Sequence, residues 1–212
     1  MLLTAQQLKL IAPSLSVAKA TELAELINLV APNYGITNKN LFEEFLATIL
    51  HESSEFSRKE ENLNYTTPER IIKIWPSRFN YTGVGGKKNA TAFVRNPKAL
   101  ANEVYNGRMG NKTGSNDGYD FRGGGFIQLT GRDMYNAYAR YHGIAASEVA
   151  DKTRKLDWWA LDSACWVFVI EKKLLPLAER NDFITITKRI NGGTIGLNDR
   201  MAYLARCRKF LV

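Results

Sequence analysis

Carboxylates are the side chains of this sequence whose placement points most clearly to chemistry. Glu52 follows the apolar run LATILH, and on a helical wheel of residues 41–56 it lands at the edge of the apolar arc, beside Phe45 and Phe56. Partial burial disfavours the charged form of a carboxyl, which is how a glutamate becomes a general acid near neutral pH. The pattern therefore predicts a proton donor at Glu52. The alternative is a boundary glutamate that reaches water or pairs with an arginine.

Glycoside hydrolysis needs a second carboxylate, which activates water or attacks the sugar. Glu60 and Glu61 follow Glu52 in SRKEENLNY. On a continuous helix Glu61 would lie about 13.5 Å along the axis, whereas an inverting pair stands roughly 6.5–9.5 Å apart with room for one water. We therefore expect the helix to break before Glu60 and the chain to fold back across a cleft. Spacing does not choose between Glu60 and Glu61, and a solvated charge pair is the alternative.

Other reaction chemistries fail on spacing. His51 and Glu52 begin a zinc-protease pattern, but position 55 is not a histidine and the chain has only two histidines. The loop 83–88 lacks the first glycine of a phosphate-binding loop, and no G-x-S-x-G nucleophile motif is present. Cys165 and Cys207 are expected to be reduced thiols, and neither lies beside a polar glycine loop. The sequence predicts no metal and no cofactor.

Helical periodicity dominates the elements that must position these groups. Three glycines at 123–125 indicate backbone that approaches something closely, and 126–130 is expected to be a short extended piece. Polar glycine-containing loops at 77–90 and 106–119 interrupt the helices, as is typical of loops that line a cleft. Apolar spacing and capping residues predict helices at 3–11, 17–30, 38–56, 68–75, 96–105, 131–142, 157–173 and 199–210, and the segment 185–190 is expected to lead into a turn at 191–193.

Size and charge restrict the kind of protein further. The chain has 212 residues, no long linker and no internal repeat, so we expect one domain without a separate wall-binding module. Its net charge of +8 favours a polyanionic partner, such as nucleic acid, an anionic membrane surface or a cell-wall polymer. A solvated basic surface is the alternative. The N-terminal MLLTAQQLKL shows no export signal, so synthesis in the cytoplasm is expected.

Three sequence blocks, taken together, resemble a known family. HESSEF…EENLNY, GYDFRGGGFIQLTGRDMY and ITKRINGGTIGLNDR occur in this order and resemble glycoside hydrolase family 19, the chitinase-like family, with its bacteriophage endolysin branch most similar. The resemblance implies a mainly α domain over 1–212, related to the lysozyme-like α+β superfamily, with few short strands. Its core lobe would comprise about 1–71 and 116–212, and its smaller lobe about 72–115, with the substrate cleft between them.

The resemblance also implies roles for individual residues in an inverting displacement on a β-1,4-linked amino-sugar polymer. Glu52 matches the general acid, Glu61 the general base, and Thr130 the hydroxyl that helps to hold the attacking water. An arginine near Glu61 would keep that carboxylate ionised by charge pairing. Substrate-binding positions are implied for Gln128, Tyr135, Asn191 and Arg200.

Two departures from the family pattern stand out. The family usually has Gly-Arg-Gly before the Gln-Leu-Thr segment, whereas this chain has Gly123-Gly-Gly125 with Arg122 one position away. Met134 stands where the family commonly has a substrate-binding asparagine. One sugar subsite is therefore expected to differ.

The expected function is lysis of a bacterial host by a lysozyme-like phage endolysin that hydrolyses peptidoglycan. Its partners would be peptidoglycan glycan strands and anionic outer-membrane lipid, but not nucleic acid, because the basic residues form no groove-reading motif. We expect a monomer that reaches periplasmic peptidoglycan after the membrane is permeabilised. The alternatives are a chitinase of the same family and a non-catalytic cell-wall-binding protein.

Overall fold

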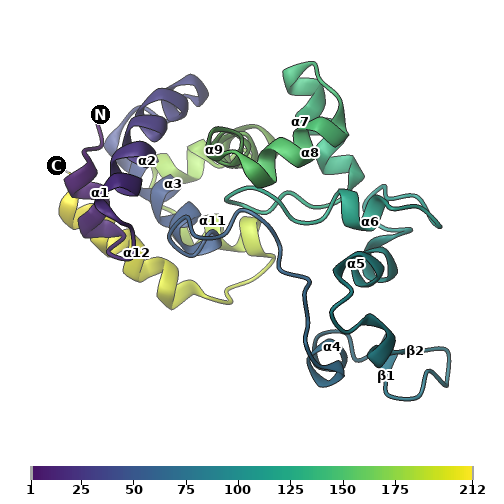
Figure 1. The fold of residues 1–212 in the computed structure, drawn as a ribbon. Coiled ribbons are helices and arrows are strands. Elements are labelled where there is room, and N and C mark those ends of the chain that lie inside the picture. Colours follow the sequence, from purple (N-terminus) through teal and green to yellow (C-terminus); the bar gives the residue numbers. More distant parts are fainter. Residues whose placement is uncertain (1, 212) are drawn as a thin grey trace. The chain divides into compact units, whose positions relative to one another are not determined.

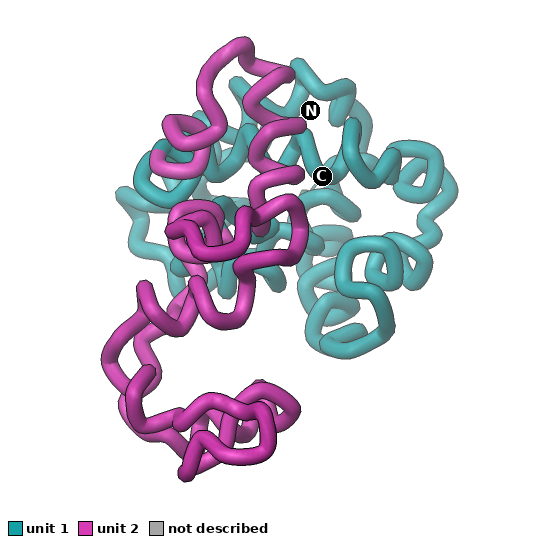
Figure 2. Tube along the Cα trace, turned by 90° about the vertical axis from the view of Figure 1, so that its right-hand side faces the viewer, with its two compact units in different colours: residues 1–59, 124–128, 152–212 teal, residues 60–123, 129–151 magenta. Residues whose placement is uncertain are grey.

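The computed structural model describes residues 2–211, and it is mainly helical with two short strands in that range. The prediction of a mainly α fold is confirmed. Met1 and Val212, the ends of the expected 1–212 domain, lie outside the described residues. The chain divides into two compact units (Figure 2): unit 1 comprises 1–59, 124–128 and 152–212, and unit 2 comprises 60–123 and 129–151. The expected smaller lobe, about 72–115, falls within unit 2.

Unit 1 is a bundle of helices in which α3 (Lys39–Glu52) packs along α12 (Leu197–Phe210) (Figure 1). Asn38 starts α3, because its side chain accepts a hydrogen bond from the Leu41 amide at 3.0 Å. The other elements of this unit are α1 (Ala5–Ile11), α2 (Val17–Val30), η1 (Ala31–Tyr34), α9 (Asp157–Trp166), the π-helical turn η3 (Val167–Glu171), α10 (Leu175–Glu179) and α11 (Phe183–Asn191).

The helix that carries Glu52 ends earlier than predicted, at Glu52 instead of position 56. The Ser53 hydroxyl donates to the Ile49 carbonyl at 2.6 Å and accepts from the Phe56 amide at 2.8 Å. Ser54, Glu55 and Phe56 then have φ angles of 50°, 55° and 63°, in the left-handed region. This turn provides the predicted break before Glu60.

The helix α3 also carries two adjacent carboxylates, Glu43 and Glu44, within its apolar run. Both are buried, with 3% and 0% of their surfaces exposed. The reason is that α3 is covered on all sides between Leu41 and Leu50, so that it has no polar face there. Arg208 of α12 compensates the buried charge, with its Nη2 3.1 Å from Glu44 Oε1.

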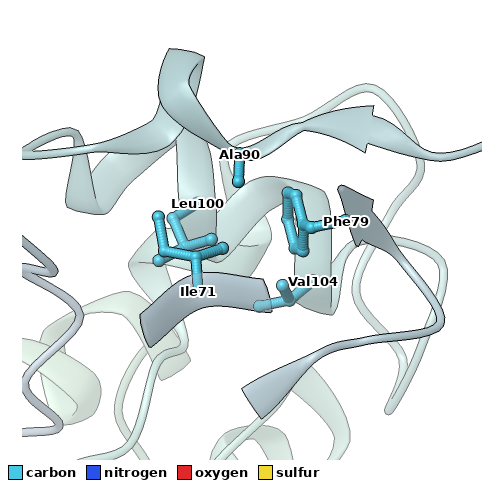
Figure 3. Close-up of a cluster of buried hydrophobic side chains, with 5 residues drawn as sticks. All are labelled: Ile71, Phe79, Ala90, Leu100 and Val104. Atoms are coloured by element: carbon cyan, nitrogen blue, oxygen red, sulfur yellow. The ribbon is translucent and has the colours of Figure 1, made fainter. Parts of the chain in front are cut away.

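Unit 2 has its own small apolar core (Figure 3), formed by Ile71, Phe79, Ala90, Leu100 and Val104. The predicted loop 77–90 contains two short parallel strands, with Phe79 opposite Lys88. The elements of this unit are α4 (Pro68–Ile74), β1 (Phe79–Asn80), β2 (Lys88–Asn89), η2 (Ala90–Phe93), α5 (Pro97–Tyr105), α6 (Asp117–Asp120) and α7 (Arg132–His142). A further helix that the sequence did not predict, α8 (Ala146–Lys155), runs from unit 2 into unit 1.

The glycine segment is a series of turns, and the extended piece predicted at 126–130 is wrong. Gln128 has a φ of 52°, which a strand does not allow. The close approach predicted for the glycines is confirmed at Gly125, where a Cβ atom would lie 2.4 Å from Ser163 Oγ. The tight contact with α9 thus sets the local backbone. Within residues 2–211, no helix has both the length and the apolar composition needed to cross a bilayer.

Candidate active site

Glu52 is the last residue of α3, and its carboxylate is bound by an arginine of α12. Arg200 Nη2 lies 2.5 Å from Glu52 Oε1. The Arg200 side chain is 2% exposed, whereas that of Glu52 is 21% exposed. The carboxylate therefore meets solvent on one side and a buried guanidinium on the other, which fixes its orientation.

The neighbouring residues form a second pair between the same two helices. His51 Nδ1 lies 2.6 Å from Asp199 Oδ2. Gly196 allows this contact, since a Cβ atom there would lie 2.7 Å from His51 Cε1. Two consecutive residues at the end of α3 are thus held by two consecutive residues in the first turn of α12. The start of α12 and the position of Glu52 are fixed together.

Two other predicted substrate-binding residues of unit 1 stabilise turns. The Asn191 side chain, exposed at the end of α11, donates from Nδ2 to the Ile195 carbonyl at 2.9 Å and so closes the turn that leads to α12. Gln128 donates from Nε2 to the Gly125 carbonyl, also at 2.9 Å. Both amides therefore support the local backbone in this structure.

Glu61 belongs to unit 2, where a tyrosine and a backbone amide bind its carboxylate. The Tyr105 hydroxyl donates to Oε1 at 2.5 Å, and the Gly123 amide donates to Oε2 at 3.2 Å. The Glu61 amide in turn donates to the Gly123 carbonyl at 2.9 Å. Burial, together with the charge of Glu61, raises the pKa of Tyr105, so the phenol stays protonated and acts as a donor.

Sequence spacing did not choose between Glu60 and Glu61 as the second carboxylate. In the structure the side chains of these two neighbours have different partners. Arg122 binds Glu60 Oε1 through Nε at 2.7 Å and Nη2 at 2.5 Å. The same guanidinium stacks 3.8 Å from the centre of the Tyr119 ring. Arg122 thus binds Glu60, and the described hydrogen bonds to the Glu61 carboxylate come from Tyr105 and Gly123.

Both glutamates line an open cavity of about 300 Å³ in unit 2. Amides, an aromatic face and a guanidinium around a carboxylate can hold a polar ring and a water molecule. The side chains that contribute these groups are Asn62, Asn64, Tyr119 and Arg122.

Tyr135 does not line the cavity but contacts a residue that does. Its side chain is buried, and its hydroxyl donates to the Arg122 carbonyl at 3.1 Å. It therefore positions the segment that carries Arg122 and Gly123. Thr130 is half-buried in the same unit, one residue before Gly131, which contacts Met109.

The structure brings together some of the predicted residues and adds others. Glu52 contacts Arg200 in unit 1, whereas in unit 2 Glu61 and Tyr135 both bind the segment 122–123. Sequence reasoning missed Tyr105, which comes 44 positions after Glu61. A tyrosine at the end of a predicted helix gives no signal of such a contact.

Comparison with known proteins identifies the family of this chain. No family model matches the chain. A protein of Haemophilus influenzae described as "Glycosyl hydrolase family 19 domain-containing protein" is 35% identical over 170 residues, which cover 78% of this chain and 78% of that protein. The protein is therefore a glycoside hydrolase of the chitinase- and lysozyme-like kind. It belongs to glycosyl hydrolase family 19, the family that the three sequence blocks resemble.

Proposed function

We propose that this glycoside hydrolase is a bacteriophage endolysin that cleaves peptidoglycan between N-acetylated amino sugars, with inversion at the anomeric carbon. The observation that carries the proposal is the contrast between two carboxylates. Glu52 is bound by a buried arginine, and Glu61 by a phenol and a backbone amide. Different environments allow two carboxyls to act as acid and base at the same pH.

Glu61 is the general base in this proposal. A carboxylate offers about four lone-pair sites, so the donors Tyr105 and Gly123 leave acceptor capacity for a water. The water attacks the anomeric carbon and its proton passes to Glu61. Thr130 supplies the second contact to that water, as the family resemblance implies.

Glu52 is the general acid. It gives its proton to the leaving glycosidic oxygen and becomes a carboxylate. Arg200 stabilises the carboxylate that remains, through a charge-assisted hydrogen bond that is already oriented. The same pair favours the ionised form of Glu52 before the reaction, so the role of acid rests on the family resemblance and on the solvent-facing side of the carboxylate. Gln128 and Asn191 would contact sugar units of the substrate, as the family resemblance implies.

The net charge of +8 supports an anionic wall as the substrate over the neutral polymer chitin. In this role the enzyme acts as a monomer on periplasmic glycan strands, which it reaches after the membrane has been permeabilised. A chitinase is the second candidate, and the family membership favours it. A non-catalytic wall-binding protein is disfavoured, because Glu52 and Glu61 both keep specific partners.

Product analysis tests the proposal. Purified protein should release muropeptides with ordinary reducing ends from peptide-stripped peptidoglycan, and mass spectrometry should detect no anhydro sugar. Proton NMR should show the inverted anomer first. Anhydro products would indicate a lytic transglycosylase and remove Glu61 from the mechanism. Faster turnover of chitin oligomers than of peptidoglycan would favour the chitinase.

Matched variants test the assignment of the two carboxylates. Glu52→Gln and Glu61→Gln should each lower turnover by roughly 10²–10⁴, the usual contribution of general acid–base catalysis. Glu60→Gln is the control, because Glu60 is adjacent to Glu61 but is held by Arg122. If folded Glu52→Gln keeps more than about a tenth of the wild-type rate, Glu52 is only a boundary residue.

A further inference from the structure

We propose that the β1–β2 loop of unit 2, residues 81–88, docks this protein on the surface of an anionic phospholipid bilayer. The proposal goes beyond glycoside hydrolysis, and it requires neither Glu52 nor Glu61. Figure 1 shows the loop leaving β1 and returning to β2. Every residue from Tyr81 to Gly86 is exposed, and so is Lys88.

The loop has a defined conformation, which a docking surface needs. Asn80 Oδ1 accepts from the amides of Thr82 at 3.2 Å and Gly83 at 2.6 Å. Asn80 Nδ2 donates to the Val84 carbonyl at 2.9 Å. The Asn80 side chain at the end of β1 thus fixes the turn. The loop therefore does not have to become ordered before the exposed Val84 side chain can bind.

Apolar side chains are exposed on this loop. Val84 is 65% exposed and Tyr81 is 55% exposed, and Ile74 at the end of α4 is 47% exposed. The Tyr81 hydroxyl is 3.2 Å from Glu69 of α4, which ties the loop to that helix. Single exposed apolar residues are common on proteins, so they carry an inference only together with the charge around them.

The surrounding charge is strongly positive. Lys88 is exposed, and Lys87 donates from Nζ to the Pro76 carbonyl at 2.9 Å, so its ammonium lies at the base of the loop. Lys73 of α4 is exposed as well. Between positions 67 and 96, Glu69 is the one acidic residue, and the same stretch carries the basic residues Arg70, Lys73, Arg78, Lys87, Lys88 and Arg95. Arg78 is paired with Glu103 of α5, so the other five supply the excess positive charge.

The combination of these groups selects the partner. A soluble polyanion would neutralise the lysines but would leave Val84 and Tyr81 in water. An anionic bilayer satisfies both features: lipid phosphates meet the ammonium groups, and the apolar side chains enter the boundary between head groups and acyl chains. Tyrosine is also enriched at that boundary, where its ring is buried and its hydroxyl stays hydrated.

Vesicle binding by the full-length protein tests this inference. Co-sedimentation should show binding to vesicles of phosphatidylglycerol and phosphatidylcholine, and little binding to phosphatidylcholine alone. The double variant Lys87→Glu/Lys88→Glu should bind the anionic vesicles at least about 20-fold more weakly, since each basic residue near the surface contributes roughly fivefold. Lys172→Glu/Lys173→Glu in unit 1 makes the same change in net charge and should bind like the wild type.

A second variant separates a membrane from other polyanions. Val84→Asp should also weaken binding to anionic vesicles, because it removes the apolar contact and adds a like charge. If Val84→Asp binds normally, or if soluble polyphosphate displaces the vesicles at equal phosphate concentration, the loop is a general anion site and the proposal is wrong. It is also wrong if Lys87→Glu/Lys88→Glu loses hydrolysis of short soluble glycans, since the loop would then serve the substrate. Binding is measured without hydrolysis, so failure of the proposed endolysin activity leaves this test intact.

Discussion

Arg200 binds Glu52 with its Nη2 atom 2.5 Å from Oε1, although 148 positions separate the two residues. The arginine is almost wholly buried, while the carboxylate keeps a solvent-facing side. We therefore expect Arg200 to act on the reaction through Glu52, whereas the sequence resemblance implied direct binding of substrate. The two roles have different kinetic signatures.

Substitution of Arg200 should lower kcat and leave KM nearly unchanged. A hydrogen bond to a charged group contributes about 1.5–3 kcal/mol, which corresponds to roughly 10–150-fold in rate. Arg200→Lys should fall within that range, and Arg200→Ala should lose more, because it also leaves a void. Steady-state kinetics on soluble glycan fragments provide the measurement. A raised KM with normal kcat would show that Arg200 binds substrate.

Tyr105→Phe should move the acidic limb of the pH–rate profile to higher pH. The Tyr105 hydroxyl donates to the Glu61 carboxylate, and loss of a donor to the charged form disfavours that form. A hydrogen bond of this kind, to a charged group, corresponds to a displacement of roughly 1–2 pH units. Tyr65→Phe is the matched control, because Tyr65 lies near Glu61 in the same unit. An identical shift in both variants would exclude a specific role for Tyr105.

Glu44→Gln should reduce the loss of stability between about pH 5 and pH 8. Burial raises the pKa of Glu44 from 4.5 to about 7, although Arg208 opposes the shift. The folded state therefore holds the proton more tightly than the unfolded chain, and this stabilisation is lost as pH rises through about 7. Urea unfolding measures this effect. Between about pH 5 and pH 8 the free energy of unfolding of the variant should fall by on the order of 2 kcal/mol less than that of the wild type.

The control for that prediction is Glu22→Gln, which changes an exposed carboxylate. It should leave the pH dependence of unfolding unaltered. If Glu44→Gln and wild type lose stability in parallel, Glu44 is ionised and paired with Arg208 at all the pH values tested.

Gly125→Ala should destabilise the fold by about 2–4 kcal/mol, because overpacking and a left-handed backbone add together. Gly125 has a φ of 85°, and a Cβ atom would lie 2.4 Å from Ser163 Oγ and 2.9 Å from Thr153 Cγ2. Gly143→Ala is the control: its φ is 67°, but no atom lies within 4 Å of its Cβ position. It should cost only about 1 kcal/mol. If Gly125→Ala and Gly143→Ala lower the melting temperature equally, the contact with Ser163 adds nothing to the destabilisation.

The sequence predicted the helices well, because apolar periodicity and local caps such as Asn38 act over a few residues. It predicted the end of α3 less well, since the stop depends on the hydrogen bonds that the Ser53 side chain makes to the backbone. The burial of Glu44 could not be predicted either. That burial depends on Arg208, which is 164 positions away.

The candidate site was likewise predicted in its residues but not in the contacts between them. Motifs selected Glu52, Glu61 and Arg200, but the pairing of Arg200 with Glu52 and the contact from Tyr105 appear only when distant segments meet. Whether Thr130, Gln128 and Asn191 contact substrate stays a prediction.

If Glu52 is the proton donor, the ion pair between Glu52 and Arg200 has a consequence for the time at which activity appears during synthesis. At bacterial rates of about 5–20 residues per second, Arg200 is made roughly 7–30 s after Glu52. Until Arg200 emerges from the ribosome, Glu52 lacks its guanidinium partner. The preceding residue, His51, likewise lacks its contact with Asp199. Nascent chains are therefore expected to be catalytically inactive. Hydrolytic activity should appear late, after α12 has docked on α3.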